Sequence, residues 1–503
     1  MKVALTPLDF LDRARRLFAP LEAVVDGDRR FTYAELADRC DRLAGLLRSR
    51  GCEPGDRVAY LCGNTVELLE AYYGVLLAGC VLTPLNIRLA PAEQQFILDD
   101  CTPAVLVVHP SFAAVADQLE PRQRVDLHDD YLGDAAPVRE RPDVDEDAVC
   151  ELFYTSGSTG DPKGAMLTHR ALATHAIDSA LTMATTHRDV VLHTIPLFHV
   201  NGWGTPHWVT ALGGRHVMLE RFDPAEVLRL IEAEGVTRLH LVPTMATSLL
   251  REASIRTRDL SSLVQATVGG APASPELLAD LEDAFGCEVV CGYGLTESSP
   301  QLTKALNLRS HDALPDEERR RKRATTGLPN VGVDLRVLDD DDNEVAWDGA
   351  HVGEICVRSN HVMTGYWNRP QETAVALRGG WLRTGDLATV DAEGYVTIVD
   401  RRKDIIVSGG ENISSVQVEH CLTSHPAVVE AAVVGMPDDK WGEVPRAFVT
   451  LEPDSDGVDE AALQAWVRER LAGFKVPKRI DVVAELPKGG TGKIQKQELR
   501  TQP

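Results

Sequence analysis

Short apolar runs alternate with longer stretches of helical spacing along most of the chain. Residues 56–62, 81–86 and 104–109 are apolar runs of strand length, and residues 67–78 have the spacing of an amphipathic helix. Strands that alternate with helices predict a parallel sheet whose two faces are covered by helices. The pattern therefore predicts an α/β protein.

The two ends of the chain add detail to this pattern. Residues 7–50 predict two helices around a short hairpin, and Thr32 with Glu35 has the pattern of a capping box at the start of the second helix. From Thr326 onward short strands predominate, and the last part of the chain again mixes helices with strands. A chain of 503 residues is too long for one ordinary core, so two or more domains are expected.

Residues 155–164, TSGSTGDPKG, form a loop rich in glycine and hydroxyl side chains directly after an apolar strand. Backbone N–H groups, hydroxyls and the Lys163 ammonium could together cradle phosphate oxygens. A solvated surface turn has the same composition, and composition alone leaves both interpretations open. The loop is not a GxxxxGK[ST] loop, because Gly164 follows Lys163, and its serines do not form the GxSxG of a nucleophile elbow.

Two glycine-rich segments follow predicted strands in the middle of the chain. Gly269-Gly270-Ala271-Pro272 would let a flat ligand approach the end of a strand closely. In the segment 292–297, Tyr293 could stack on a purine, Thr296 could donate to a phosphate, and Glu297 could bind Mg²⁺. The alternative for this segment is a turn followed by a capped helix.

Further candidate segments lie in the last quarter of the chain. Asp386 could accept hydrogen bonds from both ribose hydroxyls, and if it is buried it needs a partner. The charged segment 400–404 could be a surface turn, and the glycine-rich loop that ends at Lys493 could be a frayed basic tail. Between them lies the glycine-containing segment 408–413. Trp441 lies in a polar loop, which is unusual for tryptophan and suggests a ligand or partner.

Taken in this order, the motifs resemble those of the adenylate-forming superfamily of acyl-CoA synthetases, luciferases and peptide-synthetase adenylation domains, and the resemblance covers nearly the whole chain. It implies a large N-terminal domain, 1–400, of parallel-sheet α/β layers with a β-rich subdomain. It also implies a small mobile C-terminal α+β domain, 401–503, that rotates about a hinge at Lys403. The implied ligands are ATP, Mg²⁺, coenzyme A and a small carboxylic acid.

The resemblance also implies roles for individual residues. Lys493, Glu297, Lys163 and Thr155 would be catalytic, with Glu297 and Thr155 at the magnesium ion. The residues expected to bind ATP or AMP are Thr155, Ser156, Gly157, Ser158, Thr159, Gly160, Lys163, Gly270, Ala271, Pro272, Gly292, Tyr293, Gly294, Thr296, Asp386, Val399, Arg401 and Lys493. Those expected to hold CoA are Ser408, Gly409, Gly410, Trp441, Phe474 and Lys478.

The acyl pocket is expected around the segment PLFHVNGW, residues 196–203, which resembles the medium- and long-chain fatty acyl-CoA ligase branch. In that branch the tryptophan corresponding to Trp203 gates a tunnel for the acyl chain; ordinary core packing is the alternative. The expected lining residues are His199, Val200, Trp203, Gly204, Gly269, Gly270, Gly294 and Pro300. Ser414-Ser415, where many relatives have proline, resembles the same branch, while a short thioether, branched or aryl acid stays open.

Composition excludes several classes of function. Lys+Arg 52 against Asp+Glu 76 gives a net charge of −24, which argues against non-specific nucleic-acid binding and docking on anionic membranes. The basic run 319–323 lies in a charged helix expected at 309–323 and is more consistent with a solvated face. Ten scattered cysteines without a CxxC pair predict reduced thiols in the cytoplasm. No signal peptide, membrane span or HExxH metal site is expected, and the oligomeric state is expected to be monomer or homodimer.

The expected reaction is the ligation of a carboxylic acid to CoA in two steps, with a medium- or long-chain fatty acid as the favoured substrate. The carboxylate attacks the α-phosphorus of ATP to give acyl-AMP and pyrophosphate, and the CoA thiolate then displaces AMP. Two other functions stay open: an acyl-AMP ligase that loads a carrier protein, and a catalytically silent binding module. The presence of Lys163, Glu297, Asp386 and Lys493 argues against the silent module.

Overall fold

The computed structural model describes residues 1–133, 135–155, 162–452, 455, 458–488 and 494–501. The predicted site residues outside these ranges are Ser156, Gly157, Ser158, Thr159, Gly160 and Lys493. The chain forms two compact units, one of Met1–Leu335 with Val357–Leu382 and one of Arg336–Cys356 with Arg383–Pro503. The domain boundary expected between residues 400 and 401 stays a prediction.

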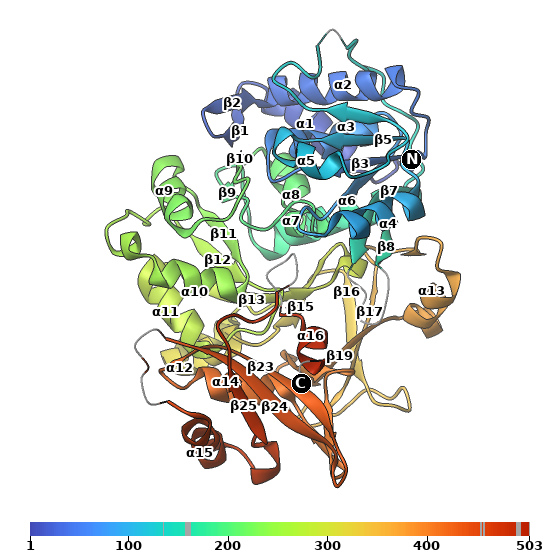
Figure 1. Cartoon of the computed structure of the whole chain (residues 1–503). Helices are drawn as coiled ribbons and strands as arrows, with labels where there is room; N and C mark the ends of the chain where they lie inside the picture. The colour runs from blue at the N-terminus through green and yellow to red at the C-terminus, as the bar shows by residue number, and fades with distance from the viewer. Residues whose placement is uncertain (134, 156–161, 453–454, 456–457, 489–493, 502–503) are drawn as a thin grey trace. The chain divides into compact units, whose positions relative to one another are not determined.

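The larger sheet of the first unit has nine strands (Figure 1). Their order is β15-β14-β13-β12-β11-β9-β10-β1-β2, and the run from β13 to β1 is parallel. The strands are β1 (Glu22–Asp26), β2 (Arg29–Thr32), β9 (Val190–Leu192), β10 (Arg215–Val217), β11 (Arg238–Leu241), β12 (Gln265–Val268), β13 (Glu288–Gly294), β14 (Gln301–Lys304) and β15 (Leu328–Pro329). The two glycine-rich segments therefore lie at the carboxyl ends of the neighbouring parallel strands β12 and β13, where open α/β sheets bind ligands.

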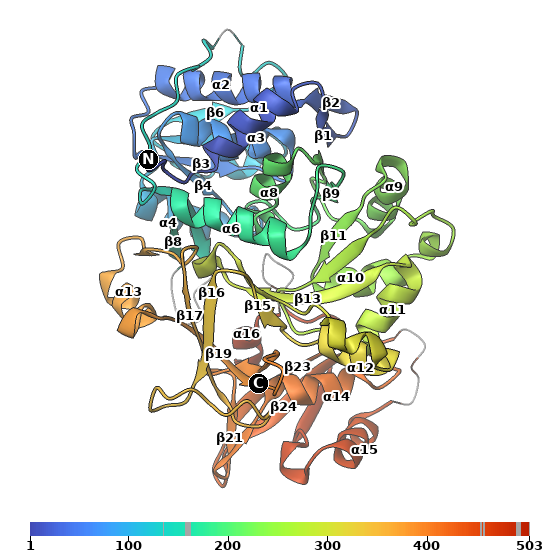
Figure 2. The ribbon, with the colours of Figure 1, turned by 180° about the vertical axis from the view of Figure 1, so that it is seen from behind.

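Three helices, α9 (Pro224–Glu234), α10 (Pro243–Arg251) and α11 (Pro275–Phe285), lie along strands β11 to β13 (Figure 2). Each has proline in its first turn, where the missing N–H costs nothing. The side chain of Ser274 caps α11 by accepting the Leu277 N–H. Apolar side chains of these helices and strands share one buried core.

The second sheet of this unit has seven strands in the order β18-β8-β7-β4-β3-β5-β6. They are β3 (Arg57–Leu61), β4 (Val81–Pro84), β5 (Val105–Val108), β6 (Arg124–Asp126), β7 (Val149–Thr155), β8 (Lys163–Thr168) and β18 (Gly365–Tyr366). Strands β3 to β7 pair in parallel, which confirms the sheet predicted from the apolar runs, whereas β8 pairs antiparallel with β7.

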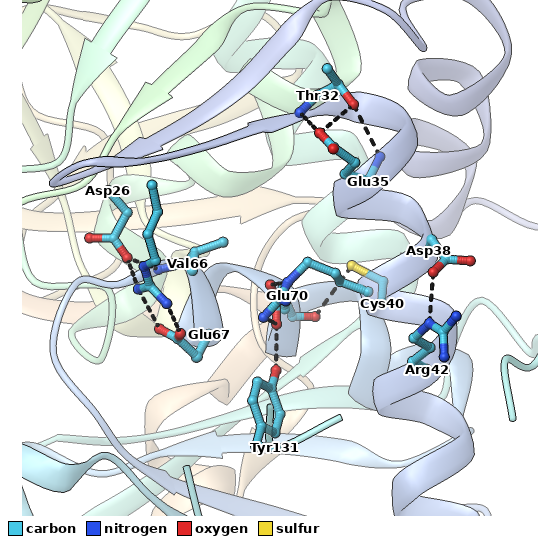
Figure 3. A network of polar contacts seen from close by, with 12 residues as sticks. Asp26, Thr32, Glu35, Asp38, Cys40, Arg42, Val66, Glu67, Glu70 and Tyr131 are labelled. Atoms are coloured by element: carbon cyan, nitrogen blue, oxygen red, sulfur yellow. Dashed lines mark hydrogen bonds and ion pairs between the residues drawn. The ribbon is translucent and has the colours of Figure 1, made fainter. Parts of the chain in front are cut away.

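Further helices belong to this first unit. They are α1 (Leu8–Leu17), α2 (Tyr33–Ser49), α3 (Val66–Leu77), α4 (Pro91–Cys101), α5 (Ala113–Ala116), α6 (His169–Thr182), α7 (Val200–Trp203), α8 (Thr205–Leu212) and α13 (Pro370–Ala376). The capping box of Thr32 and Glu35 at the start of α2 is confirmed (Figure 3). The expectation that α3 is amphipathic is wrong, because all twelve of its residues are buried.

The two glutamates of α3 have hydrogen-bond partners that allow the helix to be buried on every side (Figure 3). Glu70 has no exposed side-chain surface and accepts hydrogen bonds from Arg39 on α2 and from the Tyr131 hydroxyl. Glu67 accepts from Arg29 at 2.5 Å. A buried carboxylate is tolerated only when it is paired, and here strand β2, helix α2 and the loop with Tyr131 supply the partners.

The second unit contains a four-stranded and a five-stranded sheet. The first has the order β16 (Val333–Leu338), β17 (Gly353–Ser359), β19 (Leu382–Val390) and β20 (Val396–Arg401). The second has the order β22 (Glu411–Ile413), β21 (Ile406–Ser408), β24 (Gly442–Leu451) and β23 (Val428–Asp438), with β25 (Arg479–Val482) paired to β24. Helices α14 (Ser415–Thr423) and α15 (Glu460–Arg470) pack on this sheet around an apolar core, and α16 (Lys496–Arg500) ends the described chain.

The bounds of one expected strand and one expected helix differ in the structure. The strand expected at 190–196 ends at Leu192, and the helix expected at 309–323 divides into a 3₁₀ turn, Arg309–Ala313, and α12 (Asp316–Arg323). All ten cysteines are free thiols. Among the described residues no helix has both the length and the apolar character needed to cross a membrane.

Candidate active site

The two ends of the predicted phosphate loop are fixed by a β-hairpin in the first unit. Thr155, the last residue of β7, lies directly opposite Lys163, the first residue of β8. The Thr155 hydroxyl donates to the Lys163 carbonyl oxygen at 3.4 Å. Both residues are half-buried, so the hairpin presents a hydroxyl and an ammonium group at the same end of its two strands.

Tyr366 joins this hairpin to Glu297. Strand β18 pairs with β8, and the Tyr366 hydroxyl donates to Glu297 Oε1 at 2.7 Å while its ring centroid lies 5.6 Å from Lys163 Nζ. Burial raises the pKa of Tyr366, and the Glu297 charge raises it further, so the phenol stays protonated and donates. The structure thus brings together Thr155, Lys163 and Glu297, which are far apart in sequence.

Tyr366 binds Oε1 of the Glu297 carboxylate, so Oε2 is the oxygen that could bind the predicted divalent cation. Magnesium commonly takes one or two protein carboxylates and completes its shell with phosphate oxygens and water. The described part of the chain contains no cluster of three or more His, Cys, Asp or Glu side chains suited to a metal. A single carboxylate beside a phosphate loop fits the first arrangement and not a dedicated metal cage.

Two buried histidines hold the backbone that follows Glu297. The Gln301 N–H donates to His175 Nε2 at 3.1 Å, and His361 Nδ1 lies 2.9 Å from the Ser298 carbonyl oxygen. Burial lowers the pKa of His175 well below its usual value, so its imidazole is neutral and Nε2 can accept. The two rings meet edge to face with centroids 5.5 Å apart. Sequence reasoning found neither histidine.

The predicted adenine platform lies in strand β13. Tyr293 is half-buried and lies opposite Thr303 of β14. A Cβ on Gly294 would come within 2.0 Å of the Pro300 carbonyl oxygen, so only glycine fits there. Thr296 is buried, and Gly270 has a φ of +79°. Of the other predicted residues, Gly292 lies in β13, and Ala271 and Pro272 follow β12.

The predicted acyl segment contains a left-handed turn. Five consecutive residues from Val200 to Gly204 have positive φ, rising from 35° to 81°. This region is unfavourable for valine and tryptophan, so the surrounding structure must enforce it. His199 precedes the turn and is half-buried, whereas Val200 is buried.

A fully buried polar cluster enforces the turn. Glu151 of β7 lies 2.8 Å from His207 Nε2 through Oε1, and its Oε2 accepts from Asn201 Nδ2 at 3.1 Å. The Thr205 hydroxyl donates to the Gly202 carbonyl oxygen at 3.0 Å. Because Glu151, Asn201 and His207 have no exposed surface, loss of any one would leave its partners unsatisfied.

Trp203 covers the glycines at the ends of the neighbouring strands. A Cβ on Gly269 would lie 3.0 Å from Trp203 Cη2, and a Cβ on Gly270 would lie 3.7 Å from Cζ2. The indole also meets the His240 ring edge to face at 6.0 Å. Gly204 must lack a side chain, because a Cβ would lie 2.5 Å from His175 Cε1. The predicted acyl residues Trp203, Gly204, Gly269 and Gly270 are therefore neighbours.

In the second unit, Asp386 has the partner that its burial requires. It lies opposite Arg401 in the antiparallel pair of β19 and β20, and Arg401 Nε is 3.3 Å from Asp386 Oδ1. Arg401 is exposed, while Asp386 is buried. Val399 is two residues earlier in β20, and its carbonyl oxygen accepts from the Ser414 hydroxyl at 2.6 Å.

The predicted CoA residues of this unit fall into two groups. Ser408, Gly409 and Gly410 form the turn between β21 and β22, and the Gly409 N–H donates to the Trp441 carbonyl oxygen at 2.7 Å. A Cβ on Gly409 would lie 2.7 Å from Trp441 Cε3, so the indole packs directly on the turn while 43% of Trp441 stays exposed. Phe474 and Lys478 lie on another loop, and Phe474 is also exposed.

Comparison with known proteins agrees with these motifs. The model for the family described as AMP-binding enzyme matches residues 11–367, and that for the AMP-binding enzyme C-terminal domain matches residues 417–493. The chain is 40% identical to a feruloyl-CoA synthase from Amycolatopsis sp over 97% of both chains. It is 38% identical to a long-chain-fatty-acid–CoA ligase from Thermus thermophilus, over 98% of this chain and 95% of that one. The crystal structure of an anthranilate CoA ligase in complex with anthranoyl-AMP matches with a TM-score of 0.91 and 26% identity, over 100% of this chain and 98% of that one.

Proposed function

The chain belongs to the AMP-binding enzymes and is an AMP-forming acyl-CoA ligase, and we propose that it activates a compact apolar monocarboxylic acid, either aryl or short-chain. The observation that carries the choice of substrate is the position of the Trp203 indole. Its edge lies against Gly269 and Gly270, the two glycines at which the acyl group is expected. A compact acyl group requires less space beyond these glycines than a long alkyl chain.

The fixed backbone of the turn supports this proposal. The left-handed conformation at Trp203 is enforced by Glu151 and its buried partners, so the indole can move only by rotation of its side chain. The relative named feruloyl-CoA synthase is 40% identical, and a feruloyl group is a flat acyl group that carries an aromatic ring.

A medium- or long-chain fatty acid is the second candidate. The segment from residue 196 to 203 resembles that branch, and the Thermus thermophilus relative is a long-chain-fatty-acid–CoA ligase. For such a substrate the Trp203 side chain would have to rotate away from Gly269. The two candidates therefore differ in the position of one side chain.

In the proposed adenylation step, the first unit neutralises the phosphates. Lys163 and the Thr155 hydroxyl would contact phosphate oxygens, and Glu297, oriented by Tyr366, would hold Mg²⁺. Asp386, paired with Arg401, would accept the ribose hydroxyls, and Lys493 would bridge the carboxylate and ATP. No protein nucleophile is needed, so the role of the protein is placement and charge stabilisation.

In the proposed second step, CoA and not a carrier protein is the acceptor. The exposed Trp441, packed on the glycine turn 408–410, offers a flat apolar surface beside backbone that can approach a narrow ligand closely. Lys440 Nζ lies 4.6 Å from the centroid of that ring and would attract phosphate groups of CoA.

Release of AMP in the presence of ATP, Mg²⁺ and a panel of acids tests the proposal. The panel contains benzoic- and cinnamic-type acids and straight-chain acids from four to sixteen carbons, each with and without CoA. We expect CoA-dependent AMP release with the highest kcat/KM on an aryl or short-chain acid. A maximum at eight carbons or more would favour the second candidate, and acyl-AMP formation that CoA does not accelerate would favour a carrier protein.

A further inference from the structure

Ser415 lies at the centre of a partly buried hydrogen-bond cluster in the second unit. The Ser415 N–H and hydroxyl both donate to Asp400 Oδ2 at 2.6 Å. Lys496 Nζ donates to the Ser415 hydroxyl oxygen at 2.6 Å and lies 2.7 Å from Glu419 Oε1. These four residues, Asp400, Ser415, Glu419 and Lys496, are called the Ser415 cluster below.

In the Ser415 cluster the two central residues, Asp400 and Ser415, are buried, whereas Glu419 and Lys496 are half-buried. Asp400 is 2% exposed and Ser415 is fully buried. The second carboxylate oxygen of Asp400 accepts the Arg401 N–H at 2.7 Å, so both of its oxygens are used. Hydrogen bonds to a buried carboxylate are stronger than those between neutral groups. The cluster is therefore a firm connection between three separate segments of the chain.

The cluster connects the strand that carries Arg401 to the helix that follows the loop with Lys493. Asp400 lies in β20 next to Arg401, which is opposite Asp386. Lys496 is the first residue of α16, directly after that loop.

The ends of the loop itself are also anchored within the second unit. Lys488 and Ile494, on either side of it, pair in an antiparallel bridge, and Lys488 Nζ lies 2.7 Å from Glu430 Oε1. At the far end of α16, Arg500 donates to Asp404 Oδ1 at 2.8 Å and to the Lys403 carbonyl oxygen at 3.3 Å. Helix α16 therefore contacts the predicted hinge residue and the residue after it directly, and reaches Asp400, before the hinge, only through Ser415.

We propose that Ser415 and Lys496 are positioning residues that hold the enzyme in the arrangement used for adenylation. The inference rests on the proposed roles of Lys493 as the adenylation lysine and Lys403 as the hinge. Asp400 precedes Lys403 in sequence, whereas Ser415 and Lys496 follow it. A rotation about Lys403 would separate Asp400 from the Ser415 N–H and hydroxyl, so these two bonds favour the arrangement in which they are made. Lys496 contacts Ser415 and Glu419, which follow the hinge as it does, and therefore acts by holding the Ser415 hydroxyl in place.

The bonded arrangement favours adenylation because of what it keeps together. It ties the helix after the lysine loop to strand β20, next to Arg401 and opposite the proposed ribose ligand Asp386. Breaking the cluster would shift the population towards the alternative arrangement, in which CoA is used. Such a shift slows adenylation without slowing thioester formation, whereas general damage to the fold slows both.

The substitutions Ser415→Ala, Ser415→Pro and Lys496→Met separate the contributions. Ser415→Ala removes the hydroxyl but keeps the N–H. Ser415→Pro removes both donors and still suits α14, because Ser415 is the first residue of that helix, where proline is favourable. Lys496→Met removes the ammonium from the opposite side. Thr423→Ala is the matched control, because it removes a hydroxyl hydrogen bond at the other, exposed end of α14.

The two half-reactions are measured separately with the acid that gives the fastest turnover. Acyl-AMP formation is followed without CoA, and thioester formation is followed from supplied acyl-AMP and CoA. We expect Ser415→Ala and Lys496→Met to slow acyl-AMP formation about tenfold, Ser415→Pro to slow it more, and all three to leave thioester formation unchanged or faster. Thr423→Ala should leave both rates unchanged.

The outcomes distinguish this inference from the proposed function. Equal loss of both half-reactions in the three variants, or no change in either, would overturn the positioning role. A selective loss of thioester formation would also overturn it, since the cluster would then favour the other arrangement. Failure of the unsubstituted enzyme to form acyl-AMP with any acid would instead refute the proposed function.

Discussion

The substitution Trp203→Ala tests the proposed size of the acyl site most directly. The Trp203 indole lies in contact with the backbone at Gly269 and Gly270 and meets the His240 ring at 6.0 Å. Its removal would uncover both glycines without changing the phosphate loop or Glu297. In the unsubstituted enzyme we expect kcat/KM to stop rising once the acyl chain reaches the indole.

The size of the effect follows from the free energy of burying methylene groups. Each buried methylene contributes about 0.8 kcal/mol, or about a fourfold gain in kcat/KM. If the indole leaves room for three more methylenes, the variant should prefer the longer acid by about sixtyfold relative to the unsubstituted enzyme. The assay is CoA-dependent AMP release on straight-chain acids from four to twelve carbons. Trp347→Ala, which removes a tryptophan that is 52% exposed, is the matched control.

Two results would refute this reasoning. A fourfold gain per methylene up to twelve carbons in the unsubstituted enzyme would mean that Trp203 does not limit the acyl site. Identical chain-length profiles for Trp203→Ala and the unsubstituted enzyme would mean that the acyl group lies elsewhere. Trp203→Ala is expected to lower the free energy of unfolding by about 2–3 kcal/mol, so the rates are compared well below its melting temperature.

Three further predictions concern other residues. Lys304 is 1% exposed, and burial lowers its pKa from 10.5 to about 7. Between pH 7 and 10.5 the unfolded chain therefore binds one proton more than the folded chain, so the free energy of unfolding rises with pH across this range. At pH 7 this pKa shift lowers the free energy of unfolding by at most about 4 kcal/mol. Lys304→Met should therefore be more stable than the unsubstituted enzyme in urea unfolding at pH 7, and its advantage should shrink by about 2 kcal/mol between pH 7 and pH 9. A difference in stability that does not depend on pH would contradict this. Glu151→Ala leaves the buried Asn201 and His207 unsatisfied and should lower the free energy of unfolding by about 3 kcal/mol in the same assay. Glu151→Gln should lower it by less, and equal losses in the two variants would show that the carboxylate does not hold the turn. Lys493→Ala should abolish acyl-AMP formation but spare thioester formation from supplied acyl-AMP, and equal loss of both half-reactions would remove its proposed role.

Local patterns in the sequence were sufficient to predict much of the fold. The apolar runs near residues 56–62, 81–86 and 104–109 form β3, β4 and β5 of a parallel sheet. These strands could be predicted because an apolar run of strand length is visible in the local sequence alone. The capping box at Thr32 is equally local. The amphipathic interpretation of α3 failed, since only the folded chain shows that Arg39 and Tyr131 cover its glutamate.

The candidate site could be predicted only where its residues form contiguous motifs. Thr155 with Lys163 and the segment that contains Glu297 could be found as motifs, whereas Tyr366, which orients Glu297, is an isolated residue in a two-residue strand. The short Gly-Tyr-Trp segment from residue 365 is the one signal that could have directed attention to it. His175 is equally isolated, and its role depends on burial, which lowers its pKa and makes Nε2 an acceptor.

Two polar clusters of this chain lie outside the nucleotide motifs and yet contact the segments that we propose to control substrate choice and domain arrangement. Glu151 sets the backbone at Trp203 from a position about fifty residues away in the sequence, and it belongs to none of the nucleotide motifs. Ser415 bonds Asp400 and Lys496, which lie on opposite sides of the predicted hinge in the sequence. A substitution at either residue would leave every nucleotide-binding motif intact. The first would change which acids fit, and the second would change the balance between the two half-reactions, so specificity and turnover can diverge without any change in the motifs that define the family.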